Sequence, residues 1–394
     1  MAVVGAGAFG RNHLRVYREL EQAGAGVELA ACVEPDTGRA AAVEAEYGIP
    51  VFASVEEMLH ADARLSAATV AVPTVQHHAV ALALLDAGLD VLVEKPIAAT
   101  LAEADDMAGR AERAGRVLQV GHLERFNPAV FAVQPRLKRP MFFEAHRLSV
   151  FTPRSLDVDV ILDLMIHDLD IVLTFAASPV REVRAVGLPI VSPKVDIANV
   201  RVEFESGCVA NFTASRVSTE RVRKLRFFEP RQYVSIDYAR RDVIVIRIDD
   251  AAAAKVPPQL AAAAAEFLAT GKVDFKLAQQ LLAGGQIPAP LLAQFMAARG
   301  DAEKIKALAK SLSEPSEATP GPAPGLSFVN PEVTPGEPLR LEIESFLECV
   351  RMRKEPRVTA RQGRDALALA LAIQDAMAAH AHRAGLGDFF EGSG

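Results

Sequence analysis

The chain opens with Met1-Ala-Val-Val-Gly5-Ala-Gly7-Ala-Phe-Gly10, a short apolar run that leads at once into a GxGxxG pattern. Apolar residues then recur at helical spacing from Leu14 to Leu20, which predicts a helix directly after the glycines. A second apolar run over 27–33 ends in the acidic residue Glu34. This order of strand, glycine turn, helix, strand and acid predicts a βαβ unit at the start of a parallel sheet.

Each part of this unit has a role in dinucleotide binding. Gly5 allows a tight turn, Gly7 lets the backbone approach a pyrophosphate, and Gly10 lets helix and strand pack closely, while the helix N-terminus attracts the phosphates. Glu34 can accept hydrogen bonds from both ribose hydroxyls and would repel a 2′-phosphate, which favours NAD over NADP; Arg39 nearby keeps that preference moderate. A glycine-rich turn without a ligand is the alternative, and the flanking elements argue against it.

Alternating strands and helices continue up to residue 121. Strands are expected over 68–73, 91–96 and 116–121, and helices over 79–87 and 101–114. Ligands of such sheets bind at the carboxyl ends of the strands, where His77, Lys95 and His122 stand. Lys95 follows a Val-Leu-Val run and is expected to point into the cleft, where desolvation would lower its pKa. A lysine at a solvated strand end is the alternative.

A second stretch, 161–173, combines an apolar helix with three titratable residues. Asp163, His167 and Asp170 stand at i, i+4 and i+7, so an α-helix would stack them on one face. Buried charges are costly unless they are paired or used, and a carboxylate one turn from an imidazole can fix its tautomer and tune its basicity. Two alternatives stay open: a polar face that lines a solvated groove, and a metal site of mixed ligands.

The composition excludes several classes of protein. Of 394 residues, 50% are hydrophobic, and 43 basic against 50 acidic residues give a net charge of −7, which is not typical of nucleic-acid or membrane-surface binders. Cys32, Cys208 and Cys349 are scattered without metal-ligand spacing, which favours a reducing compartment. No run has transmembrane length, and the N-terminus does not resemble a signal peptide. We expect a cytoplasmic protein that binds neither nucleic acid nor membranes and holds no metal.

The second half of the chain is rich in strands. They are expected over 183–188, 197–204, 209–214, 222–228, 233–238 and 243–248. Glu205-Ser206-Gly207 predicts a hairpin turn between two of them. Strands that follow one another without helices indicate a separate, mainly antiparallel α+β domain. Helices, including 163–170, would cover one face of its sheet, and the other face is expected to join copies of the chain into a homo-oligomer.

The C-terminal third interrupts this pattern. Alanine-rich helical segments are expected over 251–265 and 277–309, a linker or partly disordered stretch over 313–338, and amphipathic helices over 342–353 and 363–380. The predicted fold class is therefore α/β. A Rossmann dinucleotide-binding domain is expected over 1–122, and an α+β substrate and oligomerisation domain with an open, mainly antiparallel sheet over 123–382. The latter would contain an alanine- and proline-rich insertion and linker over 251–336, and 383–394 would be a loose tail.

A group of cationic residues lies between the predicted strands of this second domain. Its members are Arg216, Arg221, Arg223, Lys224 and Arg226. They could bind the phosphate groups of a nucleotide-linked substrate. A solvated rim is the alternative, and the charge pattern alone favours it.

Several motifs together resemble those of the Gfo/Idh/MocA oxidoreductases. They are 5–10, 73–77, 94–96, 125–128, 163–170, the 196–207 hairpin and 340–347. The resemblance covers about 1–250 and 337–382. It implies a Rossmann domain joined to an open antiparallel sheet, with NAD(P) and a sugar or polyol in the cleft between them, and a cis Lys95–Pro96 bond. It also implies that Lys95, Asp163 and His167 are catalytic residues.

The motifs and strand ends described above predict two sets of ligand contacts. The cofactor contacts are Gly5, Gly7, Ala8, Phe9, Gly10, Glu34, Pro73, Thr74, His77, Glu94, Lys95 and Pro96. The substrate contacts are His122, Arg125, Asn127, Asp170 and, from the cationic group, Arg216.

Residues 121–129 and 162–170 are most similar to family members that oxidise the 3-hydroxyl of UDP-N-acetylglucosamine on the way to an amino-substituted lipid A precursor. Our hypothesis is NAD-dependent oxidation of a nucleotide sugar, in which His167 takes the hydroxyl proton, Asp163 holds its tautomer and Lys95 bonds the same oxygen. A dehydrogenase of another UDP-sugar, a uronate, a free sugar or inositol is one alternative. A non-catalytic dinucleotide-binding sensor is another.

Overall fold

The computed structural model describes residues 1–61, 64–152, 158–248, 318–320 and 326–386. The chain divides into two compact units: Met1–Phe228 with Ser235–Asp242 and Val333–Gly394, and Glu229–Val234 with Val243–Glu332. The helices expected over 251–265 and 277–309 lie outside the described residues, as does the tail beyond residue 386.

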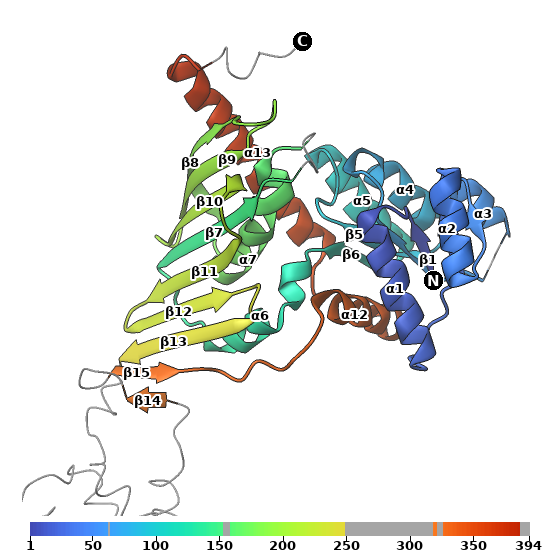
Figure 1. Cartoon of the computed structure of the whole chain (residues 1–394), viewed down its shortest axis with the longest axis horizontal. Helices are drawn as coiled ribbons and strands as arrows, with labels where there is room; N and C mark the ends of the chain where they lie inside the picture. Colours follow the sequence, from blue (N-terminus) through green and yellow to red (C-terminus); the bar gives the residue numbers. More distant parts are fainter. Residues whose placement is uncertain (62–63, 153–157, 249–317, 321–325, 387–394) are drawn as a thin grey trace, which may run out of the picture. The chain divides into compact units, whose positions relative to one another are not determined.

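The first sheet is parallel and has its strands in the order β3-β2-β1-β4-β5-β6 (Figure 1). The strands are β1 (Ala2–Val4), β2 (Ala31–Val33), β3 (Val51–Phe52), β4 (Ala67–Val70), β5 (Asp90–Glu94) and β6 (Leu118–Gly121). The helices are α1 (Ala8–Gln22), α2 (Thr37–Tyr47), α3 (Val55–Ala61), α4 (Thr74–Asp86) and α5 (Leu101–Ala114). This strand order is that of the Rossmann fold, so the predicted fold class is confirmed.

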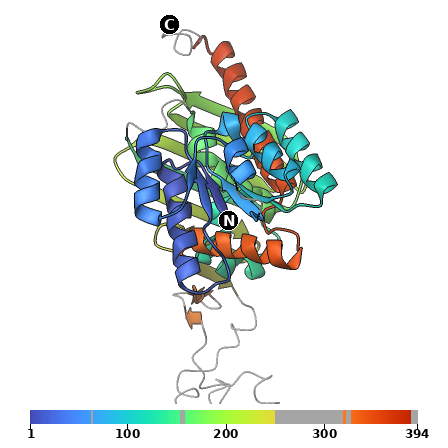
Figure 2. The same ribbon diagram turned by 90° about the vertical axis from the view of Figure 1, so that its right-hand side faces the viewer.

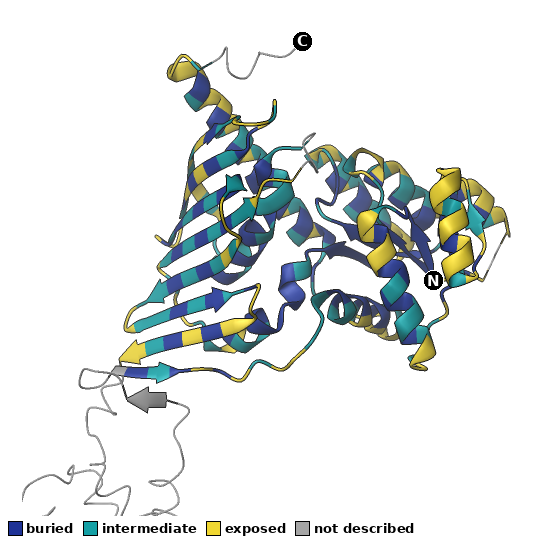
Figure 3. Cartoon of the chain, viewed as in Figure 1, coloured by how far each residue is buried: buried dark blue, intermediate teal, exposed yellow. Residues whose placement is uncertain are grey.

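The two faces of this sheet bury different helices because side chains alternate along a strand. Val4 and Val93 belong to a core cluster shared with α3, α4 and α5, whereas Val3 and Leu92 belong to one shared with α1 and α12 (Pro338–Met352). Helices therefore lie on both faces (Figure 2), and the strands between them are buried (Figure 3). Burial on both faces explains the continuous apolar run in β5.

Helix α12 packs on this first sheet, although the sequence analysis places it in the second domain. Its Ile343 and Phe346 share a core with Leu14 and Tyr17 of α1. Glu342 is fully buried in the same helix, and neither of its carboxyl oxygens has a hydrogen-bond partner in the part of the chain that is described. Burial raises the pKa of Glu342 well above its ordinary value, and the charge of Glu94 raises it further. The domain boundary at residue 122 stays a prediction, with α12 returning to the first domain.

The second sheet of the first unit is open, with neighbouring strands in the order β11-β7-β10-β9-β8. They are β7 (Phe142–Val150), β8 (Val180–Leu188), β9 (Ile197–Phe204), β10 (Val209–Ser218) and β11 (Val222–Glu229). Only the pairing of β7 with β10 is parallel among these neighbours, so the expected mainly antiparallel sheet is confirmed. The predicted turn joins β9 to β10, with Gly207 at a φ of 82°.

Helices cover one face of this second sheet (Figure 1). After β6, the short helices η1 (Leu123–Phe126), α6 (Pro128–Val133) and η2 (Gln134–Arg136) lead into β7. Helix α7 (Ile166–Ala176) packs on α13 (Ala360–Arg383), and α13 also packs on β8. The expected oligomer contact through the other face stays a prediction.

A π-helical turn, Ile161–Met165, precedes α7. In this turn the backbone N–H of Ile166 donates to the carbonyl of Ile161, an i→i+5 bond. The sequence predicts a regular α-helix over this stretch. The regular α-helix is therefore wrong at 161–165, and the common face of Asp163 and His167 stays a prediction.

The second unit contains β14 (Ala318–Pro320), β15 (Leu326–Val329) and most of β13 (Asp242–Ile248), with β15 antiparallel to both others. Strand β12 (Gln232–Asp237) is divided between the two units. The prediction of a linker over 313–338 is therefore wrong at 326–329. There an alternating run, Leu-Ser-Phe-Val, pairs with 245–248, a partner that local composition does not reveal.

Candidate active site

The glycine turn has the geometry that a bound pyrophosphate requires. Gly5 has a φ of 95°, and a Cβ on Gly10 would lie 1.9 Å from the carbonyl oxygen of Gly5. Only glycine at residue 10 therefore allows α1 to approach β1. A Cβ on Gly7 would meet nothing within 4 Å, and Ala8 and Phe9 follow in the exposed first turn of α1. The turn thus leaves the helix N-terminus open to a phosphate, as the sequence predicts.

Glu34 directly follows β2 and is only 4% exposed. Its carboxylate accepts the backbone N–H groups of Ala6 at 2.9 Å and Asp36 at 3.0 Å, and the guanidinium of Arg39 at 2.8 Å. Although burial opposes the charge, these bonds, with that of Arg39 foremost, lower the pKa of Glu34 below its ordinary value. The carboxylate is therefore fixed as an anion beside the glycine turn, where a dinucleotide ribose would lie.

The Lys95–Pro96 bond is cis, as the resemblance implies. Glu94, the last residue of β5, pairs with His13 at 2.7 Å between Oε1 and Nε2. His13 lies on α1 and is fully buried. The sequence analysis missed it; its place soon after the glycines was the only available signal.

The turn between β4 and α4 is tied to the cis bond by His77. Pro73 caps α4, and Thr74 is its first residue. His77 is 1% exposed, with Nδ1 2.9 Å from the carbonyl of Pro96 and Nε2 2.9 Å from the carbonyl of Val72. His77 therefore lies between two turns on the cofactor side, and its N–H donates to one of these two carbonyls, depending on the tautomer.

Lys95 is anchored to the π-helical turn. Its Nζ donates to the carbonyl of Asp163 at 2.8 Å and to that of Leu162 at 3.4 Å. An ammonium has three N–H donors, so one remains for a ligand. Burial lowers the pKa of Lys95, and the charge of Asp163 opposes that effect. The sequence predicts that Lys95 points into the cleft, and in the structure its Nζ reaches backbone carbonyls of the segment that holds Asp163.

His167 lies within range of the charge of Lys95. Burial lowers the pKa of His167 well below its ordinary value, and the charge of Lys95 lowers it further. Its Nδ1 is buried and has no hydrogen-bond partner among the described residues. Within the same residues, no hydrogen bond joins Asp163 to His167, so the expected bond that fixes the tautomer is not formed.

Buried polar atoms without partners gather around Lys95 and His167. In the part of the chain that is described, they include both ring nitrogens of His122 and Nδ1 of His167. Burial lowers the pKa of His122, and the charge of Asp170 opposes that effect. Buried polar atoms that lack partners are costly, which indicates that this group is arranged around a polar ligand.

The structure corrects the prediction that Asn127 binds substrate. Its Oδ1 caps α6 by accepting the N–H of Ala129 at 3.1 Å. Its Nδ2 donates to Glu124 at 3.0 Å and to the carbonyl of Tyr238 at 3.2 Å. All the hydrogen-bonding groups of the amide are therefore used inside the protein.

Arg125 and Arg216 are both buried and bind acceptors within the protein, so their role as substrate contacts stays a prediction. Arg125 donates to the hydroxyl of Thr174 and to the carbonyl of Arg357, and its Nε lies 3.5 Å from Asp170. Arg216 is 5% exposed; it donates to the carbonyl of Val158 and lies 3.5 Å from Asp196. Both side chains anchor neighbouring segments to one another.

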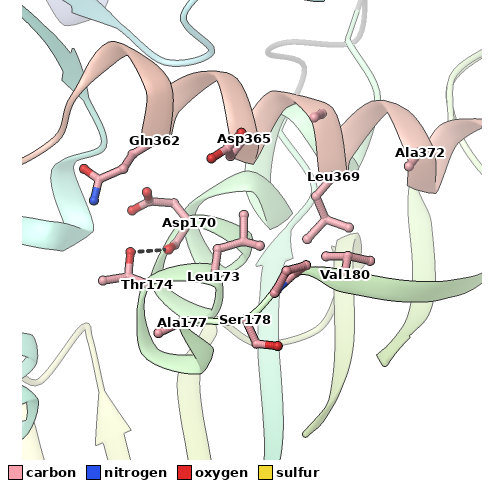
Figure 4. A pocket seen from close by; sticks show the side chains of 12 residues that line it. Asp170, Leu173, Thr174, Ala177, Ser178, Val180, Gln362, Asp365, Leu369 and Ala372 are labelled. Atoms are coloured by element: carbon pink, nitrogen blue, oxygen red, sulfur yellow. Dashed lines mark hydrogen bonds between the residues drawn. The ribbon is translucent and has the colours of Figure 1, made fainter. Parts of the chain in front are cut away.

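A cavity of about 730 Å³ opens between α7 and α13 (Figure 4). Asp170, Leu173 and Thr174 line it from α7, and Gln362 and Asp365 line it from α13. The Thr174 hydroxyl donates to the carbonyl of Asp170 at 2.9 Å. Asp170 therefore lines this cavity, and its charge also acts on His122.

A buried ionic network that the sequence analysis missed supports α7 from the second sheet. Arg147 of β7 binds both carboxylate oxygens of Asp168, at 2.7 and 3.0 Å, and Glu124 at 3.1 Å. Its guanidinium also lies 5.3 Å from the ring centre of Tyr238. Although burial opposes the charge, Asp168 and Glu124 raise the pKa of Arg147 above its ordinary value. The one signal of this network in the sequence was Asp168, a further charged residue in the largely apolar helix α7.

Two further observations bear on the class of protein. No group of three or more His, Cys, Asp or Glu side chains within the described residues is placed to hold a metal ion, which leaves the metal alternative for Asp163, His167 and Asp170 without support. None of the described helices is long and apolar enough to cross a membrane.

Comparisons with known proteins agree with this geometry. Residues 1–122 match the oxidoreductase family with an NAD-binding Rossmann fold, and 130–231 match the GFO/IDH/MocA C-terminal domain. The UDP-N-acetylglucosamine 3-dehydrogenase of Acidithiobacillus ferrooxidans is 40% identical over 237 residues, which is 60% of this chain and 73% of that protein. The scyllo-inositol 2-dehydrogenase (NAD(+)) of Bacillus subtilis is 26% identical over 232 residues, 55% of this chain and 71% of that protein.

A solved structure of the UDP-N-acetylglucosamine 3-dehydrogenase from Acidithiobacillus ferrooxidans matches the whole fold. It has a TM-score of 0.72 at 28% sequence identity, and covers 96% of this chain and 97% of that chain. The chain therefore belongs to the Gfo/Idh/MocA family and is a dehydrogenase that acts on CH–OH groups with a nicotinamide dinucleotide.

Proposed function

We propose that the chain uses NAD to oxidise a secondary hydroxyl of a nucleotide sugar, and that this hydroxyl is the 3-OH of UDP-N-acetylglucosamine. The observation that carries the proposal is the pair of buried imidazoles, His122 and His167, whose ring nitrogens without hydrogen-bond partners among the described residues lie beside Lys95. A sugar ring supplies the several donors and acceptors that such a group needs. The relative that is 40% identical and is named for this reaction supports the choice of sugar. The 3-keto product would then serve amino-sugar synthesis toward a lipid A precursor.

The chain's own residues divide the work of binding. The glycine turn and the N-terminus of α1 hold the pyrophosphate, and Glu34 accepts the ribose hydroxyls. The nicotinamide, when bound, accepts the hydride from the carbon that carries the hydroxyl.

His167 takes the hydroxyl proton in this proposal. Its lowered pKa keeps the imidazole neutral at neutral pH, which is the form that can accept a proton. Lys95 donates its remaining N–H to the same oxygen and stabilises the developing alkoxide. The carbonyls of Leu162 and Asp163 hold the ammonium in place, and the charge of Asp163 helps to keep it protonated.

A substrate panel tests the proposal. The kcat/KM for NADH formation should be at least ~10²-fold higher with UDP-N-acetylglucosamine than with free N-acetylglucosamine. The reason is that contacts with the nucleotide supply binding energy that stabilises the transition state at the sugar ring. The panel includes UDP-glucose, a UDP-linked uronate and inositol, and the Lys95→Met variant gives the background rate. Preference for inositol would favour the alternative that the Bacillus subtilis relative suggests. Binding of NAD without turnover of any substrate would favour a sensor.

The choice of NAD is tested at Glu34. In the Glu34→Ser variant the anion that would repel a 2′-phosphate is lost, and Arg39 is released from its 2.8 Å bond. We expect the ratio of kcat/KM for NADP to that for NAD to rise by about tenfold or more, which corresponds to ~1.4 kcal/mol. Initial rates with each cofactor measure this ratio. Glu46→Ser, which removes a surface carboxylate from α2, is the matched control, and an unchanged ratio at Glu34 would contradict the assignment.

A further inference from the structure

Two members of the cationic group defined above differ from the other three. The paired members are Arg216 with Asp196 at 3.5 Å, Lys224 with Asp237 at 3.9 Å and Arg226 with Glu144 at 2.8 Å. Arg221 and Arg223 are exposed, and neither guanidinium has an ion pair or hydrogen bond within the described ranges of the chain. Of the cationic group, these two are the guanidiniums with donors available to an anion.

The strand register places Arg223 on the inner face of the second sheet. β11 pairs antiparallel with β7, with Arg223 opposite Arg147 and Lys224 opposite His146. Residues directly opposite each other point to the same face, so Arg223 shares a face with Arg147, which binds Asp168 of α7. Lys224 points to the other face.

Arg223 also lies close to the catalytic group. Its charge acts on His167, where it adds to the lowering of the pKa that burial begins. Arg147 is neutralised by its two carboxylates, whereas Arg221 and Arg223 have no such partner. An exposed pair of cations beside a group of orphaned sugar-binding atoms is complementary to a substrate that carries two phosphates.

We propose that Arg223, assisted by Arg221, binds the diphosphate of a nucleoside-diphosphate substrate. This inference rests on the proposed function and names the residues that recognise the substrate outside the reacting ring. A guanidinium presents a planar pair of N–H donors that matches two phosphate oxygens. Arg147 cannot take this role, because its donors are bound to Asp168 and Glu124.

Binding of UDP to the full chain tests the inference without any need for turnover. Calorimetry in the presence of NADH should show a Kd for UDP that is about 10- to 100-fold weaker in Arg223→Gln than in the unmodified chain, since charge-assisted hydrogen bonds are lost. Arg221→Gln should give a smaller loss, and Arg223→Lys an intermediate one, because lysine keeps the charge but not the fork. Lys224→Gln is the matched control: it removes the same charge one residue away, on the opposite face.

Steady-state kinetics separate recognition of the diphosphate from a general structural defect. Arg223→Gln should raise KM for UDP-N-acetylglucosamine by a similar factor, while KM for NAD stays unchanged and kcat changes little. Equal binding of UDP by Arg223→Gln and the unmodified chain would overturn the inference, as would equal weakening by Lys224→Gln.

The proposed function fails in a different way. If the unmodified chain binds UDP through Arg223 but oxidises another UDP-sugar, the diphosphate site stands and the choice of sugar is wrong. If it oxidises UDP-N-acetylglucosamine and Arg223→Gln binds UDP normally, only the diphosphate site is overturned. Failure of the unmodified chain to bind UDP overturns the diphosphate site.

Discussion

The His167→Ala variant is expected to lose turnover by ~10²- to 10⁴-fold while its affinity for NAD stays nearly unchanged, because proton transfer by a placed base is worth that much. The dinucleotide contacts proposed above lie on β1, α1, β2 and the turns after β4 and β5, so the substitution leaves them intact. Turnover is measured with UDP-N-acetylglucosamine, and affinity for NAD by calorimetry. Equal losses of turnover and NAD affinity would indicate misfolding, and unchanged turnover would remove His167 from the reaction.

The pH dependence of kcat/KM is a second test of His167 as the base. Catalysis requires neutral His167, and burial lowers its pKa well below the ordinary value of 6.5. The kcat/KM of the unmodified chain should therefore stay level as pH falls through 6.5 and decline only at lower pH, where the imidazole becomes protonated. This acid limb should be absent from the residual activity of His167→Ala. His60→Ala, an exposed histidine on α3, should retain both the rate and the limb.

The second large effect is expected on stability. Arg147→Met should lower the free energy of unfolding by ~3–5 kcal/mol, because it leaves Asp168 and Glu124 buried without their cation. Denaturant unfolding measures the loss. Arg201→Met is the matched control: it removes an exposed arginine that lies 3.6 Å from Glu203 on the same sheet, and surface pairs contribute ~0–1 kcal/mol.

The network can also be removed as a whole. Arg147→Met combined with Asp168→Asn and Glu124→Gln leaves no buried charge at this place, so it should recover part of the stability lost by Arg147→Met alone. A loss below 1 kcal/mol in Arg147→Met would show that the two carboxylates find other partners or protonate at little cost.

Local patterns in the sequence were sufficient to predict many of the helices and strands in both sheets' domains. Helix α5 of the first sheet and strand β9 of the second were predicted over the same residues that form them. Alternation along a strand, helical spacing and glycine turns act over a few residues, so they can be read without knowledge of the fold. The glycine turn, Glu34 and the place of Lys95 at a strand end were found in this way.

The partners of the charged groups could not be read from the sequence, because they come from distant segments. Arg147 and Asp168 are 21 residues apart, and Arg125 reaches the carbonyl of Arg357, 232 residues away. Asn127 and Arg216 were predicted to bind substrate because amide and guanidinium groups suit that role. In the structure both side chains are buried and bind other segments of the chain.

The sequence by itself determined that this protein has a Rossmann sheet, an open second sheet, and a lysine and a histidine suited to dehydrogenation. Only the tertiary structure decided that Lys95 is held by the carbonyls of the π-helical turn and that α12 packs on one face of the first sheet. It also decided that Arg216 is paired with Asp196, whereas the guanidinium of Arg223 has no such pair. The physical reason is that local backbone preferences and apolar spacing fix the elements, whereas long-range packing fixes which polar groups are buried together and which remain without a partner.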